Sequence, residues 1–231
     1  MKLRYGLVLV AAALITIPTA SAASLSLASQ NLTPVRTCIL SGYPKADAGE
    51  IDAMVEQTNP GTNYGANNNI EVESHNATQI RTYIEFLVTG CAPTMPSTAT
   101  VLSATLRLYA TGLPGNCRTE DIFPATAAWT EGAITWNNQP FGTTLNNPAS
   151  GYTAQMQVGT PCPANKVVGY VTGWAVTTDV QKFVAGSSTN YGWMIRDDLE
   201  GSGTAYTTTY AAKDFNSNTE DPQLTISYID G

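Results

Sequence analysis

The chain has 231 residues and carries 18 acidic against 11 basic side chains, which gives a formal net charge of −7. This balance argues against nucleic acid or an anionic membrane surface as the main partner, because both require a positive face. The one histidine, His75, lies in a polar segment. It is interpreted as a surface-loop residue rather than a catalytic base, and a His-rich metal centre is excluded.

The first 22 residues are predicted to be a secretory signal peptide. Lys2 and Arg4 form its basic start, and an apolar run over 7–17 follows that is too short to span a bilayer. Ala20-Ser21-Ala22 then matches a cleavage site. We therefore expect a secreted, extracellular protein without membrane insertion, whose mature form is more acidic because the leader takes two positive charges with it.

Four cysteines are present, and none of them forms a C-x-x-C pair that would suggest zinc. In a secreted chain an even number of cysteines predicts disulfides. Three connectivities are open for Cys38, Cys91, Cys117 and Cys162. The sequential pairing, Cys38–Cys91 with Cys117–Cys162, is preferred, and each bridge would close a loop of about fifty residues and contribute about 3–4 kcal/mol.

Alternation of apolar and polar residues dominates the sequence and predicts strands. After Val101, the residues Leu102, Ala104, Leu106 and Leu108 recur at every second position, so we expect them to share the buried face of one strand. Further strands are predicted at 35–41, 51–56, 68–73, 80–88, 152–158, 166–172, 191–196, 205–212 and 223–229.

One segment has a helical pattern, with Asp179 expected to cap its N-terminus and Gly186 to close its C-terminus. Many short strands without alternating helices predict an all-β fold, an antiparallel β-sandwich of jelly-roll type with one short helix. Residues 23–47 would hold a lead-in and the first strand, and 48–231 the sandwich domain. The oligomeric state is left open.

A four-residue motif occurs twice. Thr62-Asn63-Tyr64-Gly65 recurs as Thr189-Asn190-Tyr191-Gly192. Asn and Gly tolerate the left-handed backbone of tight turns. The repeat is interpreted as two similar turns that lead into strands.

Acidic residues suggest two kinds of site. Asp197, Asp198 and Glu200 gather hard oxygen ligands of the kind that suits Ca²⁺. Their spacing differs from an EF-hand loop, so a solvated acidic turn is the preferred interpretation and a calcium site is the alternative. No other cofactor is predicted. Glycoside hydrolysis needs two opposed carboxylates, and the sequence does not place any two acids opposite each other, so a non-catalytic protein is predicted.

Aromatic residues offer a further signal, because the apolar faces of sugar rings stack on Trp and Tyr. Trp136, followed by Asn137, Asn138 and Gln139, is the most ligand-like cluster in the chain. Taken alone, Trp136 is still more readily interpreted as a core residue whose indole N–H is bonded internally. For Trp129 the core role is preferred.

Several short motifs occur in an order that resembles one domain family. They are Asp52–Val55, Asn63–Gly65, Arg81–Phe86, Ser103–Tyr109, Trp129–Glu131, Trp136–Pro140, Asp179–Val180, Asn190–Trp193 and Pro222–Leu224. This series resembles the DNRLRE domain, also called disaggregatase-related, which is similar to the family 96 carbohydrate-binding modules. The resemblance covers most of the chain after the predicted leader.

The resemblance implies a secreted, non-catalytic β-sandwich that binds extracellular or cell-wall polysaccharide. Family 96 modules bind acidic polysaccharide such as alginate through basic side chains, and Arg81, Arg196 and Lys213 are the matching cations here. The hypothesis is therefore glycan binding through these three residues with Trp136 and Tyr64. The acidic net charge leaves a neutral glycan open, and a structural or adhesive surface protein without a sugar site is the alternative function.

Overall fold

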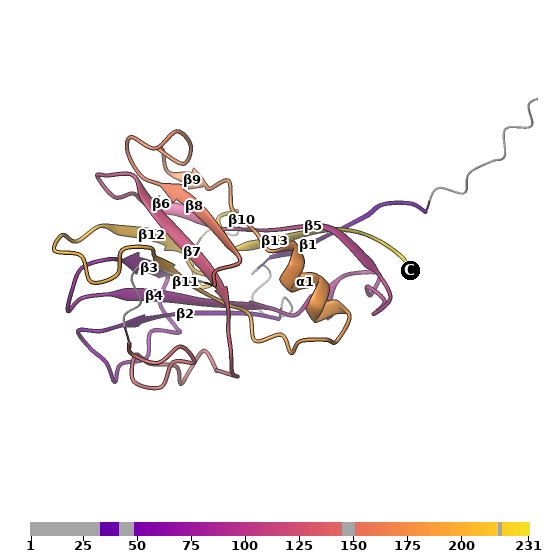
Figure 1. Ribbon diagram of the computed structural model, residues 1–231, viewed down its shortest axis with the longest axis horizontal. Coiled ribbons are helices and arrows are strands. Elements are labelled where there is room, and N and C mark those ends of the chain that lie inside the picture. Colours follow the sequence, from indigo (N-terminus) through magenta and orange to yellow (C-terminus); the bar gives the residue numbers. More distant parts are fainter. Residues whose placement is uncertain (1–32, 42–48, 145–150, 217–218) are drawn as a thin grey trace, which may run out of the picture. The chain divides into compact units, whose positions relative to one another are not determined.

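Two antiparallel sheets form the domain in the computed structural model, which describes residues 33–41, 49–144, 151–216 and 219–231 (Figure 1). Thirteen strands, a 3-10 turn (η1, Val88–Gly90) and one α-helix occur in these residues. The predicted antiparallel β-sandwich with a single short helix is thus confirmed. No helix in the described ranges is long and apolar enough to cross a membrane.

The smaller sheet has four strands. Their order across the sheet is β1 (Arg36–Ser41), β13 (Gln223–Ile229), β5 (Thr100–Arg107) and β10 (Trp174–Ala175). The first and last strands of the domain therefore lie side by side, and β1 forms an edge of the sheet.

The larger sheet has nine strands. Eight follow in the order β8 (Ala154–Val158), β7 (Arg118–Pro124), β11 (Trp193–Asp197), β4 (Ile80–Phe86), β3 (Asn69–Glu73), β12 (Thr207–Ala211), β6 (Tyr109–Gly112) and β9 (Gly169–Tyr170), while β2 (Glu50–Glu56) pairs with β4. The strands β7, β11, β4 and β2 form the part of the sheet whose outer face is covered by the layer that holds the candidate site described below.

The main core lies on the inner face of the larger sheet and contains buried aromatic and aliphatic side chains from both sheets. Its two tryptophans satisfy their N–H groups internally, as buried indoles usually do. Trp174 Nε1 donates to Glu120 O at 3.0 Å, and Trp193 Nε1 donates to Asp179 Oδ2 at 3.0 Å.

A second core covers the outer face of the same sheet. The loop over residues 125–144 packs Trp129, Ile134 and Trp136 against side chains of β2, β4, β7 and β11. Strand alternation explains the arrangement: in β4, Ile84 faces the main core while Tyr83 faces this outer core. Both faces of these strands are thus buried, and the outer layer holds the candidate site.

The helix α1 spans Thr177–Val184, and Val176 occupies its N-cap position without a side-chain cap. The predicted capping role of Asp179 is therefore wrong, because this residue lies within the first turn. Its carboxylate instead accepts hydrogen bonds from Thr153 Oγ1 at 2.6 Å and from Trp193 Nε1. Gly186 closes the helix as predicted: it has φ +67°, and its N–H donates to Phe183 O at 3.2 Å.

The strand prediction needs correction in two places. The segment 166–172 is a strand only at Gly169–Tyr170, and Leu102 lies on the other face of β5 from the one predicted. The pairing of β5 with β13 is irregular between Ser227 and Tyr228, which leaves Leu102 as an extra residue. Val101 faces the core in its place, and the Leu102 side chain is 48% exposed. The other three residues of the predicted series are buried.

Both disulfides form in the preferred sequential arrangement. Cys38–Cys91 ties β1 to the residue after η1, and Cys117–Cys162 ties the residue before β7 to the loop that follows β8. No free cysteine occurs among the described residues. Each bridge thus links segments that lie far apart along the chain.

Candidate functional site

Two of the predicted sugar-binding cations share one buried carboxylate. Arg81 binds Glu200 through both a 2.6 Å contact from Nε to Oε1 and a 2.9 Å contact from Nη2 to Oε2, while Arg196 Nη1 reaches Oε2 at 2.7 Å. Both arginines are only 2% exposed. Thr82 of β4 pairs with Ile195 of β11. Arg81 precedes Thr82 and Arg196 follows Ile195, so the two arginine side chains lie opposite each other on the outer face of these strands.

Trp136 covers this ion cluster instead of presenting a face to solvent. Its ring lies 4.9 Å from the Arg81 guanidinium and is 3% exposed. Gln139 Oε1 accepts from Arg81 Nη1 at 3.0 Å, and the carbonyl of Gly142 accepts at 2.9 Å. Trp136 is therefore buried with one ring face on Arg81, and its ligand-stacking role stays an untested prediction.

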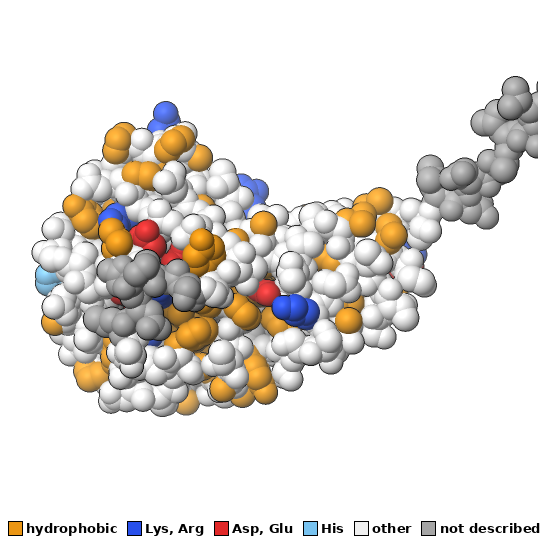
Figure 2. Space-filling model, in the orientation of Figure 1, with side chains coloured by type: hydrophobic (Ala, Val, Ile, Leu, Met, Phe, Trp, Pro, Cys, Tyr) orange, Lys and Arg blue, Asp and Glu red, His pale blue; other side chains and the backbone are white. Residues whose placement is uncertain are grey.

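The remaining predicted ligand residues lie elsewhere and have internal partners. The Tyr64 hydroxyl donates to the Glu56 carboxylate. Lys213 Nζ contacts Glu131 Oε1 at 3.0 Å and Asp214 Oδ2 at 2.8 Å, and these hydrogen bonds raise the pKa of Lys213 although its partial burial lowers it. The five predicted residues thus do not form one open basic face. On the face seen in Figure 2, basic side chains stand apart from one another.

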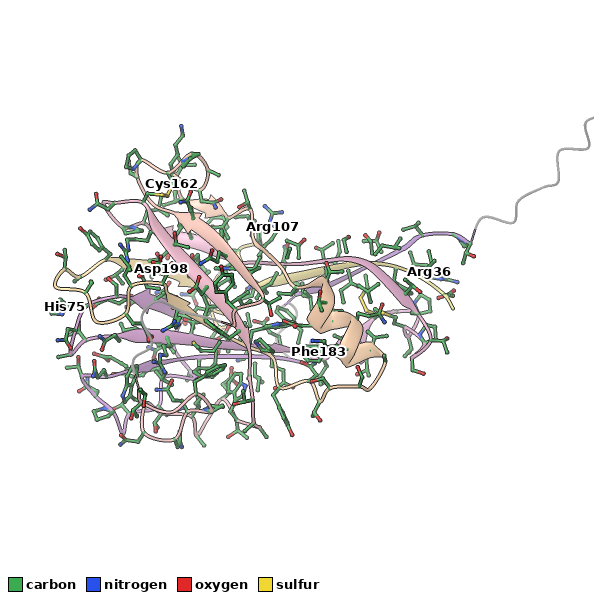
Figure 3. The ribbon with its side chains drawn as sticks, viewed as in Figure 1. Arg36, His75, Arg107, Cys162, Phe183 and Asp198 are labelled. Atoms are coloured by element: carbon green, nitrogen blue, oxygen red, sulfur yellow. A yellow bond between two sulfur atoms is a disulfide. The ribbon has the colours of Figure 1, made fainter. Side chains whose placement is uncertain are left out.

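The acidic triplet after β11 is bound by arginines. Arg118 donates to both carboxylate oxygens of Asp197, with 2.9 Å from Nε to Oδ2. Its Nη2 also lies 3.6 Å from Oδ1 of Asp198, which is labelled in Figure 3. Partial burial, and then the charge of Asp197, raise the pKa of Asp198 to about 6. Glu200 belongs to the Arg81–Arg196 cluster. Within the described ranges, no three His, Cys, Asp or Glu side chains gather to hold a metal, so calcium binding stays an untested prediction.

Two neighbouring depressions open on the outer layer. The first, of about 260 Å³, is lined by Ala128, Trp129, Thr130, Ala133, Ile134 and Asn138. The second, of about 390 Å³, is lined by Pro124, Ala125, Thr126, Ser188, Thr189 and Tyr191. Trp129 Nε1 donates to Tyr191 O at 2.8 Å and so joins the two linings. We call these twelve residues the Trp129–Tyr191 surface.

The repeated Thr-Asn-Tyr-Gly motif holds this surface in place. Asn63 Nδ2 donates to the carbonyls of Glu131 at 2.6 Å and Ile134 at 2.8 Å, and so ties down the loop that lines the first depression. Asn190 Nδ2 donates in the same way to Phe86 O at 2.7 Å and ties the segment of the second depression to β4. In both copies the asparagine Oδ1 accepts from the glycine N–H two residues later.

The glycine of each copy permits a close backbone approach. A Cβ at Gly65 would lie 2.2 Å from Glu131 O, and a Cβ at Gly192 would lie 2.1 Å from Ile84 O. Only glycine fits at such distances. The two turns predicted from the sequence are therefore anchors that press two loops onto the domain, a role that the repeat itself could have suggested.

The lining of the Trp129–Tyr191 surface carries no charged side chain in the part of the chain that the structure describes. It combines two aromatic residues with exposed hydroxyl groups, among them Thr126, Thr130 and Ser188. Sequence reasoning assigned Trp129 to the core, which its burial confirms, but missed that it also lines a depression. Such a lining can stack on apolar ring faces and hydrogen-bond hydroxyl groups.

Comparison with protein families gives a match over most of the chain. The family model for carbohydrate-binding module family 96 matches residues 46–228, which covers most of the chain and all of the Trp129–Tyr191 surface. No curated protein matches the chain. By the extent of this match, the chain belongs to carbohydrate-binding module family 96.

Proposed function

We propose that the protein is a secreted, non-catalytic module that binds extracellular or cell-wall polysaccharide at the Trp129–Tyr191 surface. Membership of a carbohydrate-binding family supports the ligand class. The observation that carries the location is the pair of depressions whose linings are linked by the hydrogen bond from Trp129 to Tyr191. Concave, partly aromatic surfaces with a few hydrogen-bonding groups are the usual form of small-ligand sites.

Two further features support the secreted, non-catalytic part of the proposal. The two disulfides suit an oxidising, extracellular compartment, in agreement with the predicted signal peptide. Hydrolysis of a glycosidic bond requires two opposed carboxyl groups. The described lining of the Trp129–Tyr191 surface contains none.

A pull-down with insoluble polysaccharides and an affinity gel with soluble ones test this function. Tyr191→Ala removes a partly buried aromatic ring while keeping the backbone carbonyl that Trp129 uses. Tyr206→Ala, which removes a partly buried ring stacked on Arg118 outside the surface, is the matched control. Polysaccharide retention that Tyr191→Ala loses and Tyr206→Ala keeps is expected; no retention of any polymer by folded protein would contradict the function.

A structural or adhesive role is the second candidate, and one observation favours it. The edge strand β1 carries Ile39, whose side chain is 63% exposed. Val35, the residue that precedes this strand, is 62% exposed. Open edges with apolar side chains favour association between chains. Light scattering at increasing protein concentration tests this role: growth of oligomers that Ile39→Lys abolishes would support it, and a monomer at all concentrations would contradict it.

A further inference from the structure

We infer that the polysaccharide bound at the Trp129–Tyr191 surface is uncharged, and that one chain of it spans both depressions. This inference rests on the proposed function and specifies its ligand. It departs from the acidic polysaccharide that the sequence motifs imply, and the reasons lie in where the cations are and in what lines the surface.

The three cations that match the basic pattern of the family are committed to internal ion pairs. Arg81 and Arg196 share Glu200, and their side chains are almost wholly buried. Lys213 lies between two carboxylates. Releasing a buried arginine to a ligand would leave Glu200 short of a partner inside the protein, which is costly. The residues that match the basic pattern therefore maintain the fold and are not available to a polyanion.

The lining itself suits hydroxyl groups better than carboxylates. Tyr191 offers aromatic surface from a partly exposed position, and Trp129 lines the first depression although it is only 8% exposed. Thr126, Thr130, Ser188 and Thr189 offer hydroxyls that both donate and accept hydrogen bonds. An uncharged sugar ring presents the same two features, an apolar face and a rim of hydroxyls. The formal net charge of −7 adds a general repulsion toward polyanions.

The two depressions are positioned for consecutive sugar rings of one chain. The Trp129 indole of the first lining donates to the Tyr191 carbonyl of the second, so the two depressions lie close enough for one extended chain to contact both. Asn63 and Asn190 fix the two loops before any ligand arrives. Binding therefore requires little reordering of the protein, and an oligosaccharide should bind more tightly than a single sugar.

Calorimetry with defined polymers tests the inference. The uncharged probes are hydroxyethylcellulose, galactomannan and mixed-linkage β-glucan, and the acidic probes are alginate and polygalacturonate, each at about 50 mM and about 500 mM NaCl, since salt screens only charged contacts. The polymer that binds is then replaced by its oligosaccharides of increasing length.

Two variants address the two depressions separately. Tyr191→Ala removes the aromatic ring of the second depression, and Ala133→Gln adds an uncharged side chain at an exposed position in the lining of the first. Tyr206→Ala again serves as the matched control. Near-ultraviolet circular dichroism and thermal melting establish that each variant is folded before binding is measured.

The expected result is binding of an uncharged polymer that salt does not change, that strengthens from one sugar to several, and that weakens at least about tenfold in both surface variants. Salt-sensitive binding of the acidic polymers alone would overturn the inference and leave the proposed function standing. Equal affinity for one sugar and for several would overturn the two-depression arrangement. Binding that neither variant weakens would overturn the location, and no binding of any probe would overturn the proposed function itself.

Discussion

Arg81 and Arg196 lie on adjacent strands and bind the same carboxylate, Glu200, with all three side chains buried. Both guanidinium groups thus share the charge of Glu200, and Arg81 also donates hydrogen bonds to the Gly142 and Thr144 carbonyls. In water-free surroundings such an arrangement is stable only when every member stays in place. The cluster fastens the 125–144 loop to the outer face of the sheet.

Neutralising the shared carboxylate should therefore destabilise the domain. We expect Glu200→Gln to lower the free energy of unfolding by about 3–5 kcal/mol, because two buried guanidinium groups lose their counter-charge. Chemical denaturation measures this loss. The exposed pair Arg36–Asp230 is the matched control, and Asp230→Asn should cost less than about 1 kcal/mol. Equal costs for the two substitutions would show that the Glu200 cluster is not a structural element.

The close backbone approach at Gly65 predicts that two nearby glycines differ in how much stability an alanine substitution costs. Gly65→Ala places a methyl group against the Glu131 carbonyl and should cost several kcal/mol, about 3 or more, by forcing the loop away. Gly61→Ala meets no atom within 4 Å and should be neutral or slightly stabilising. Thermal melting compares them, and hydrogen exchange should show faster opening of residues 130–134 only in Gly65→Ala. Similar melting of both variants would contradict the anchor role.

The sheet layers could largely be predicted from the sequence because alternation, turn residues and cysteine number act locally or pairwise. The strand predicted at 80–88 and the sequential disulfides are confirmed for this reason. Leu102 was assigned to the wrong face, since the irregular pairing with β13 depends on a strand more than a hundred residues away. Asp179 was misplaced because its true partners, Thr153 and Trp193, come from other elements.

The candidate site was harder to predict. Residue type indicated that Arg81 and Trp136 could contact sugar, but not that a loop would bury them beneath a second core. The partners of both arginines depend on the register between β4 and β11, which no local pattern reveals. The Trp129–Tyr191 surface arises from two loops about sixty residues apart, joined by one hydrogen bond. The repeated turn was visible in the sequence, whereas its target carbonyls were not.

The disulfides should contribute to different parts of the domain. Cys38–Cys91 holds the edge strand β1, which pairs only with β13 among the described strands. We expect the double variant Cys38→Ala/Cys91→Ala to lose about 3–4 kcal/mol of stability, with increased hydrogen exchange concentrated in β1. The variant Cys117→Ala/Cys162→Ala should instead increase exchange around β7 and β8, which its bridge connects. The same exchange pattern in both variants would contradict this division.

Buried carboxyl groups give the stability a dependence on pH. Burial raises the pKa of Asp52 to about 7, against the lowering effect of the hydrogen bond from the Lys213 N–H, and the neighbouring Glu131 adds to the rise. Burial likewise raises the pKa of Glu120 to about 8, although the Thr208 and Tyr210 hydroxyls lower it. Both groups therefore hold a proton in the folded state at a pH where the unfolded chain has already lost it.

Unfolded carboxyl groups have a pKa of about 4, and below that pH the stability from Asp52 and Glu120 is fully present. It is lost as pH rises through the folded-state pKa of about 7 for Asp52 and about 8 for Glu120. Each group can contribute up to about 4 kcal/mol over that window. We therefore expect denaturant midpoints to fall from pH 5 to pH 8.5. Glu120→Gln, whose amide oxygen still accepts from Tyr210, should flatten the fall, whereas the exposed Asp230→Asn should not. A stability that rises over this range, or that Glu120→Gln leaves equally steep, would show that Glu120 is ionised within the folded core.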